Sequence, residues 1–219
     1  MEKTYIIANW KSNKLQQESQ EWANSFKEKT FSEEKEVIVC PPFTLLATLA
    51  WFAKTNVLPF KLGAQNISAF LAGSYTGEIY AEQIKEYVTY TIIGHSERRN
   101  LFHESDEEIA KKVANAKAAG IEIVFCVQDE NTSIPEGVTI VAYEPVSAIG
   151  SGNPDTPENA AAVAKAIKEK HPQVLSVLYG GSVTPENVHS FTTQSGISGV
   201  LVGKASLDPQ SFLGIIQNA

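Results

Sequence analysis

VTIVAYEPVSAIGSG, residues 138–152, joins an apolar strand-like run to an acidic residue that stands directly after it. The acid is Glu144, and Pro145 follows it before a stretch of small residues that contains Gly150 and Gly152. Proline fixes the backbone at the near edge of that stretch, and glycine leaves the far edge free to turn. This order predicts a catalytic carboxylate at the end of a buried strand, followed by a lid made of residues 145–153.

Seven other short apolar runs accompany this strand along the chain, and longer segments of helical pattern separate most of them. Several runs are apolar at nearly every position, which is typical of parallel strands buried on both faces. Eight strand-then-helix units predict a single α/β domain over residues 1–219, folded as a (β/α)8 barrel. The expected strands are 5–8, 37–40, 61–64, 90–93, 122–126, 139–143, 175–179 and 199–202.

The expected helices carry start and stop signals. Ser105 and Glu108 form a capping-box pattern, and Gly120 is placed to end the same helix. Thr156-Pro157 and Thr184-Pro185 each predict an N-cap followed by proline at the first helical position. In the first helix we expect one apolar stripe, made of Leu15, Trp22, Ala23 and Phe26.

The unit between the fifth and sixth strands lacks its helical segment. Residues 127–138 include Pro135 and Gly137 and show no helical period. A complete crossover with its helix needs at least about 10–12 residues. The sequence therefore predicts that the helix between strands five and six is absent or reduced to a turn. The trimmed unit also helps to explain a length of 219 residues, where about 250 is typical of such barrels.

The amino-acid composition limits the kinds of ligand that the protein is expected to bind. The chain is 43% hydrophobic and 20% charged, an ordinary globular mixture, and its formal net charge is -7. An acidic protein is a poor partner for nucleic acid, which needs a basic surface. A small anionic substrate remains possible where a local cation overcomes the overall field.

The two cysteines and four histidines show no metal-binding pattern. Cys40 and Cys126 each stand in an apolar run and form no Cys-x-x-Cys pair, so we expect buried structural thiols and no metal site. Unpaired thiols suit a reducing compartment. The N-terminus shows no signal-peptide layout and no apolar run approaches a membrane span, so we expect a cytoplasmic protein without a membrane partner.

Polar residues with catalytic potential follow several strands. Because the carboxyl ends of barrel strands meet at one mouth, these residues are expected to share one rim. Glu144 can take a proton from carbon, Lys11 supplies positive charge, and Asn9 and His95 can donate hydrogen bonds to a developing oxyanion. The expected phosphate-binding residues, from the lid and from the loops after strands seven and eight, are Gly150, Ser182, Gly203 and Lys204.

Three motifs in order along the chain, Asn9-Trp10-Lys11, Gly94-His95-Ser96-Glu97-Arg98-Arg99 and the segment that begins at Glu144, resemble those of the triosephosphate isomerase family. The resemblance covers nearly the whole chain. It implies a TIM barrel that interconverts dihydroxyacetone phosphate and D-glyceraldehyde 3-phosphate through an enediolate, without a cofactor. In this family a glutamate is the base, a neutral histidine polarises the carbonyl, and a lid excludes water; the matching residues are Glu144, His95 and 145–153.

The resemblance also implies supporting residues and a partner. Glu97 is expected near Lys11, Arg99 in a structural ion pair, and Cys126 behind the site. The family's segment after strand three reaches into a neighbouring subunit, which here predicts a homodimer through residues 65–78. A tetramer is an alternative if barrel wall is left exposed where the helix is missing.

The chain departs from the family at three positions. Ser147 stands where tryptophan is usual at the first lid hinge, and Asn153 where a basic residue is common at the second. Lys204 stands where a second glycine is common in the phosphate loop.

Two other functions remain open. Another phosphate-binding barrel, such as an aldolase or a lyase, is the first. A Schiff-base aldolase would need a lysine inside a strand, and Lys61, at a strand edge, is the one candidate. A non-catalytic scaffold is the second, although such a protein would be expected to lose Glu144, His95 or Lys11.

Overall fold

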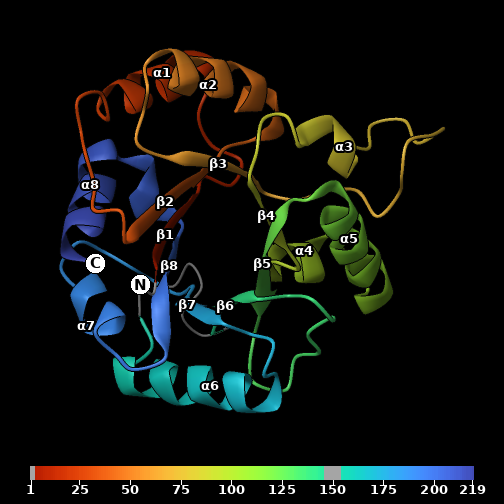
Figure 1. The fold of residues 1–219 in the computed structure, drawn as a ribbon, viewed down its shortest axis with the longest axis vertical. Coiled ribbons are helices and arrows are strands. Elements are labelled where there is room, and N and C mark those ends of the chain that lie inside the picture. The colour runs from red at the N-terminus through yellow and green to blue at the C-terminus, as the bar shows by residue number, and fades with distance from the viewer. Residues whose placement is uncertain (1–2, 146–153) are drawn as a thin grey trace.

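The computed structural model describes residues 3–145 and 154–219, and within them eight parallel strands form a closed barrel (Figure 1). Each strand pairs with the next along the chain, and β8 pairs with β1 to close the ring. The predicted (β/α)8 barrel is confirmed. The strands are β1 (Thr4–Asn9), β2 (Lys35–Cys40), β3 (Lys61–Ala64), β4 (Tyr90–Ile93), β5 (Glu122–Val127), β6 (Ile140–Tyr143), β7 (Ser176–Tyr179) and β8 (Ile197–Val202).

Helices surround the barrel (Figure 1). Ser105 caps one of them by accepting a hydrogen bond from Glu108 N–H, and Gly120 ends the same helix with a φ of 74°. Thr156 caps another by accepting from Asn159 N–H. The helices are α1 (Gln16–Asn24), α2 (Phe43–Thr55), α3 (Ala81–Ile84), α4 (Ser96–Leu101), α5 (Asp106–Ala119), α6 (Pro157–Lys170), α7 (Val188–Thr192) and α8 (Pro209–Asn218), with a 3-10 turn, η1 (Lys204–Leu207), before α8.

Two expectations about helices are wrong. Leu15 does not belong to the apolar stripe of α1, because it precedes the first turn and its side chain is 74% exposed. The segment after Thr184 forms a turn, and α7 begins only at Val188. Thr184 Oγ1 still accepts a hydrogen bond from Glu186 N–H at 3.3 Å, and Asn187 Oδ1 accepts from Thr184 N–H at 2.8 Å, so the capping contacts are present around this turn.

Strand side chains alternate between two apolar layers. The inner layer fills the barrel, and the outer layer lies between the strands and the helices. In β1, Ile7 belongs to the inner layer, whereas Ile6 and Ala8 belong to the outer one. Both cysteines, Cys40 and Cys126, are free thiols buried in the inner layer. The same alternation continues at the strand ends and decides which of their side chains face the mouth.

The loop between β5 and β6 replaces a helix, as predicted, because residues 128–139 are all described and contain no helix. Ile134 and Val138 bury their side chains against the outer layer and cover the barrel wall at this point. Lysines from the two flanking helices hold the loop by its backbone: Lys117 at the end of α5 donates to Glu136 O, and Lys170 at the end of α6 donates to Glu130 O. The wall is therefore not left bare.

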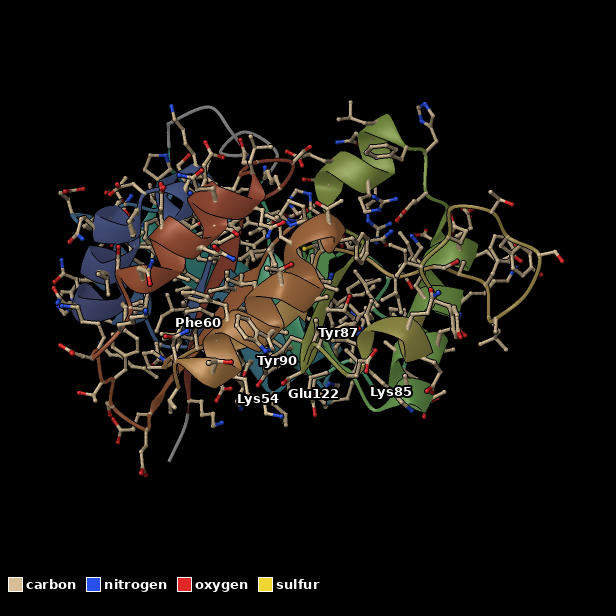
Figure 2. All side chains as sticks on the ribbon, turned by 90° about the horizontal axis from the view of Figure 1, so that it is seen from above. Lys54, Phe60, Lys85, Tyr87, Tyr90 and Glu122 are labelled. Carbon is tan, nitrogen blue, oxygen red and sulfur yellow. The ribbon has the colours of Figure 1, made fainter. Side chains whose placement is uncertain are left out.

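A charged cluster occupies the end of the barrel where the strands begin. Glu36, which is buried, pairs with Lys3 and Lys61 and accepts a hydrogen bond from Tyr90 Oη. Burial opposes ionisation of Glu36, but the two ammonium groups outweigh it and lower the pKa of the carboxyl. Figure 2 shows Tyr90 and Glu122 at this end of the barrel. Among the described residues, no helix is long and apolar enough to cross a bilayer.

Candidate active site

A cavity of about 840 Å³ opens at the carboxyl ends of the strands. It receives side chains from the ends of β1, β4 and β6 and from the loops after β7 and β8. The structure thus brings together most of the residues singled out in the sequence. Those lining the cavity are Asn9, Lys11, His95, Glu144, Ser182, Gly203 and Lys204. Gly150, Ser147 and Asn153 lie outside the described residues, as does most of the predicted lid.

Glu144 follows β6 and is only 2% exposed. Its backbone N–H donates to Val127 O at 2.8 Å, which extends the β5–β6 ladder to this residue. One carboxylate oxygen, Oε2, accepts a hydrogen bond from Ser96 N–H at 2.9 Å, and the other, Oε1, lies 2.9 Å from His95 Nε2. Fixed donors on both oxygens stabilise a carboxylate that burial would otherwise disfavour.

His95 is the N-cap of α4, and this position decides its tautomer. Its Nδ1 accepts a hydrogen bond from Glu97 N–H at 3.2 Å, so that nitrogen carries a lone pair and the ring proton belongs on Nε2. The Nε2–H then points to Glu144, on the cavity side. The ring is therefore arranged as a neutral hydrogen-bond donor through Nε2.

The Asn9 side chain is held by the backbone of Lys11, and that backbone is held in turn by the residue that follows β3. Asn9 Oδ1 accepts from Lys11 N–H at 3.1 Å, which leaves the Asn9 amide nitrogen as the end that can donate to a ligand. Lys11 has a φ of 51°, an unusual value for a residue with a side chain. Gln65, the first residue after β3, donates from Nε2 to both Lys11 O and Cys40 O at 2.9 Å and so secures this backbone.

The expected supporting residues surround this set. Glu97 Oε1 lies 2.5 Å from Lys11 Nζ, so a carboxylate restrains the ammonium group. Arg99 donates to Gly94 O at 2.9 Å and pairs with Asp106 at 2.7 Å. Cys126 is fully buried, and burial, together with the neighbouring carboxylate of Glu144, raises the pKa of its thiol. The thiol is thus a neutral neighbour of Glu144 and no nucleophile.

Glycines shape the loop that follows β7. A Cβ on Gly180 would lie 3.0 Å from Glu144 Cγ, and a Cβ on Gly181 would lie 2.2 Å from Tyr179 Oη. A Cβ at Gly181 would therefore displace the Tyr179 hydroxyl, and a Cβ at Gly180 would crowd the Glu144 side chain. Gly180, Gly181 and Ser182 all line the cavity, and the Gly180 N–H is bonded to Tyr143 O at 2.7 Å.

Two contacts of the site were missed in the sequence. Ser96 N–H is the donor that holds Glu144, and its signal was its place directly after His95, at the start of a helix. Gln65 was assigned only to the subunit interface, although it is a polar residue at a strand end, the same signal that identified Asn9. Within residues 3–145 and 154–219, no cluster of three or more His, Cys, Asp or Glu side chains could hold a metal ion.

Comparison with known proteins identifies the family of this chain. The family model described as triosephosphate isomerase matches residues 4–219. The chain is 38% identical to the triosephosphate isomerase of Aquifex aeolicus, over 96% of this chain and 97% of that protein. It is also 38% identical to that of Dictyoglomus thermophilum over the full length of both, and 35% identical to that of Mesomycoplasma hyopneumoniae over 99% of this chain. The chain belongs to the triosephosphate isomerase family.

Proposed function

We propose that this protein interconverts dihydroxyacetone phosphate and D-glyceraldehyde 3-phosphate. The observation that carries the proposal is the meeting of a buried carboxylate, a neutral imidazole donor and an ammonium group in one cavity, from Glu144, His95 and Lys11. These are the groups that a proton transfer next to a carbonyl requires: a base for carbon and donors for the oxygen that becomes negative. Family membership supports the same activity.

In the proposed mechanism, Glu144 removes a proton from C1 of dihydroxyacetone phosphate. The C–H electrons form the C1–C2 double bond, and the carbonyl electrons move to O2. His95 Nε2–H and Lys11 Nζ stabilise the charge on that oxygen, with Asn9 as a further donor. Glu144 returns the proton to C2, while His95 moves a proton between the two oxygens. The carboxylate must leave Ser96 N–H and His95 Nε2 to reach the substrate carbon.

The phosphate group is proposed to bind on the β7 and β8 side of the cavity. Ser182, Gly203 and Lys204 line this side, and we include Gly150 from the lid. A Cβ on Gly203 would lie 3.7 Å from Lys11 Cε, so the loop after β8 runs beside the lysine stem. Lys204 adds a positive charge that a second glycine would not provide. Barrels commonly bind phosphate at these two loops.

The alternative of a Schiff-base aldolase loses its candidate lysine. Lys61 opens β3, at the end of the barrel opposite the cavity, where it pairs with Glu36. Its ammonium group lies 5.9 Å from the ring centre of Tyr90, which Figure 2 shows at that end. The alternative of a non-catalytic scaffold is disfavoured because Glu144, His95 and Lys11 are all present in one cavity.

We further propose a homodimer formed through residues 65–78. This segment carries exposed apolar side chains, with Phe70 stacked on Tyr75 at 4.2 Å, and it extends away from the barrel (Figure 1). Leu101 and Phe102, at the end of α4, are exposed as well.

Because Ile134 and Val138 cover the barrel wall between β5 and β6, that wall offers no reason for a tetramer. Sedimentation equilibrium should give twice the 23.8 kDa chain mass; the mass of a single chain would contradict the dimer.

A cytoplasmic location is proposed as well. Both cysteines are free and buried, which fits a reducing compartment. Cell fractionation tests this point, and recovery of the protein outside the cytoplasm would contradict it.

The proposed activity is tested directly by a coupled assay. Purified protein is given glyceraldehyde 3-phosphate, and formation of dihydroxyacetone phosphate is followed; the reverse direction is measured separately. We expect turnover in both directions without added metal or cofactor. A protein that is folded by circular dichroism but inactive in both directions would overturn the proposal.

A further inference from the structure

Asp155 makes an unusual set of contacts between two strands and a helix. It lies directly before Thr156, the N-cap of α6. Its carboxylate accepts hydrogen bonds from Tyr143 Oη at 3.3 Å, from Thr156 N–H at 2.8 Å and from Asn159 Nδ2 at 2.7 Å. Its backbone N–H donates to Tyr179 Oη at 2.8 Å. A single residue therefore joins β6, β7 and α6, which pack together (Figure 1).

The two tyrosines occupy equivalent places in neighbouring strands. Tyr143 and Tyr179 are register partners in the β6–β7 pair, and each is the last residue of its strand. Glu144 follows the first tyrosine, and Gly180 follows the second. Burial raises the pKa of Tyr143, with Asp155 adding to the effect, and raises the pKa of Tyr179 to about 12. Both hydroxyls are consequently protonated at neutral pH.

Further contacts hold the Tyr179 ring and the two strand ends in place. The Tyr179 ring stacks on Phe191 with centroids 3.9 Å apart and an interplanar angle of 5°. Gly180 N–H donates to Tyr143 O at 2.7 Å, so the two strand ends are bonded to each other where the tyrosines sit. A shift of Tyr143 would move Glu144, its covalent neighbour, and would strain the bond to Gly180.

We infer that the Asp155 carboxylate is a positioning element for the base: it holds the Tyr143 hydroxyl and thereby fixes the strand end that carries Glu144. The hydrogen bond from Asp155 N–H to Tyr179 Oη holds the backbone from which this carboxylate extends. The contacts to Thr156 and Asn159 attach it to the fourteen-residue helix α6. The effect on catalysis rests on the proposed function, whereas the effect on the strand end does not.

A carboxylate suits this position because its three partners among the described residues, Tyr143 Oη, Thr156 N–H and Asn159 Nδ2, all donate. The carboxylate accepts at both oxygens, whereas an asparagine would present an NH2 group in place of one of them. Asp155→Asn keeps the volume and the backbone contact to Tyr179 but loses at least one acceptor. Tyr143→Phe keeps the buried ring and removes only the hydroxyl. Both substitutions therefore address the same hydrogen bond from its two sides.

The test is a double-mutant cycle with Asp155→Asn, Tyr143→Phe and the two combined. Each single variant should lower kcat on the order of tenfold, since misplacing a reacting group by a fraction of an ångström is costly. KM should stay nearly unchanged, because the phosphate-binding loops keep their contacts. The double variant should be little worse than either single one. Unchanged kcat, a loss confined to KM, or fully additive losses would each overturn the inference.

Hydrogen exchange provides a readout that needs no activity. In Asp155→Asn and Tyr143→Phe, the backbone amides of Glu144 and Gly180 should exchange faster than in the parent protein. Glu108→Gln is the matched control, since it weakens the cap of α5 without contacting β6 or β7. An inactive parent protein would refute the proposed function alone. Exchange at Glu144 and Gly180 that is no faster than in the control would refute the role of Asp155, whatever the activity.

Discussion

Glu144→Gln is expected to lower kcat on the order of 10³-fold, because an amide cannot take up the proton that the isomerisation moves. Glutamine has nearly the same size as glutamate, so the buried side chain keeps its packing. Its oxygen can still accept from Ser96 N–H. Its NH2 group would then face the Nε2–H of His95, two donors against each other, which predicts only a modest loss of stability.

The Glu144→Gln variant separates the loss of proton transfer from any loss of phosphate binding. Competitive inhibition by inorganic phosphate should be retained, because Ser182, Gly203 and Lys204 are untouched. Glu107→Gln is the matched control: it makes the same chemical change at an exposed position on α5, where Glu107 pairs with Lys111. The control should keep full activity. Turnover by Glu144→Gln within tenfold of the parent would rule out Glu144 as the base.

The barrel could be predicted because each strand is a short, continuous segment whose residues are nearly all apolar. Continuous apolar runs identified every strand to within two residues, and the break in helical period identified the trimmed unit. That Asn9, His95 and Glu144 share one rim followed from topology, since parallel strands bring their carboxyl ends together. Their selection as catalytic residues depended on the motifs around them and on the resemblance of those motifs to the family.

Contacts that depend on three-dimensional placement could not be predicted. Nothing in the sequence pairs Gln65 with Lys11 O, because the two residues belong to different barrel units. The bond between Asp155 and Tyr143 lies within the β6–α6 unit, but it depends on the path of the loop that joins them, which the sequence does not give. The exposure of Leu15 was missed for a related reason: an apolar period gives the face of a helix but not the residue at which the helix begins. The start of α7 was misplaced because the capping signal at Thr184 marks a single turn, and the helix itself begins at Val188.

Lys11→Met is expected to reduce kcat/KM on the order of 10³-fold, since a fixed charge aimed at a developing oxyanion stabilises the transition state. The net charge of the chain is -7, so an anionic substrate approaches against the overall field and depends on local cations. Methionine retains the length and apolar character of the lysine stem but supplies no charge. Glu97 then loses its partner and adds negative charge near the substrate.

Lys14→Met is the matched control for this substitution. Lys14 belongs to the same segment after β1 and has a left-handed backbone like that of Lys11, with a φ of 71°, but it does not line the cavity. Its ammonium group lies 5.3 Å from the ring centre of Trp10, a contact that contributes to stability. Lys14→Met should therefore change the thermal midpoint slightly and leave kcat/KM near the parent value. Equal losses in both lysine variants would mean that the segment, and not the Lys11 charge, is what the reaction requires.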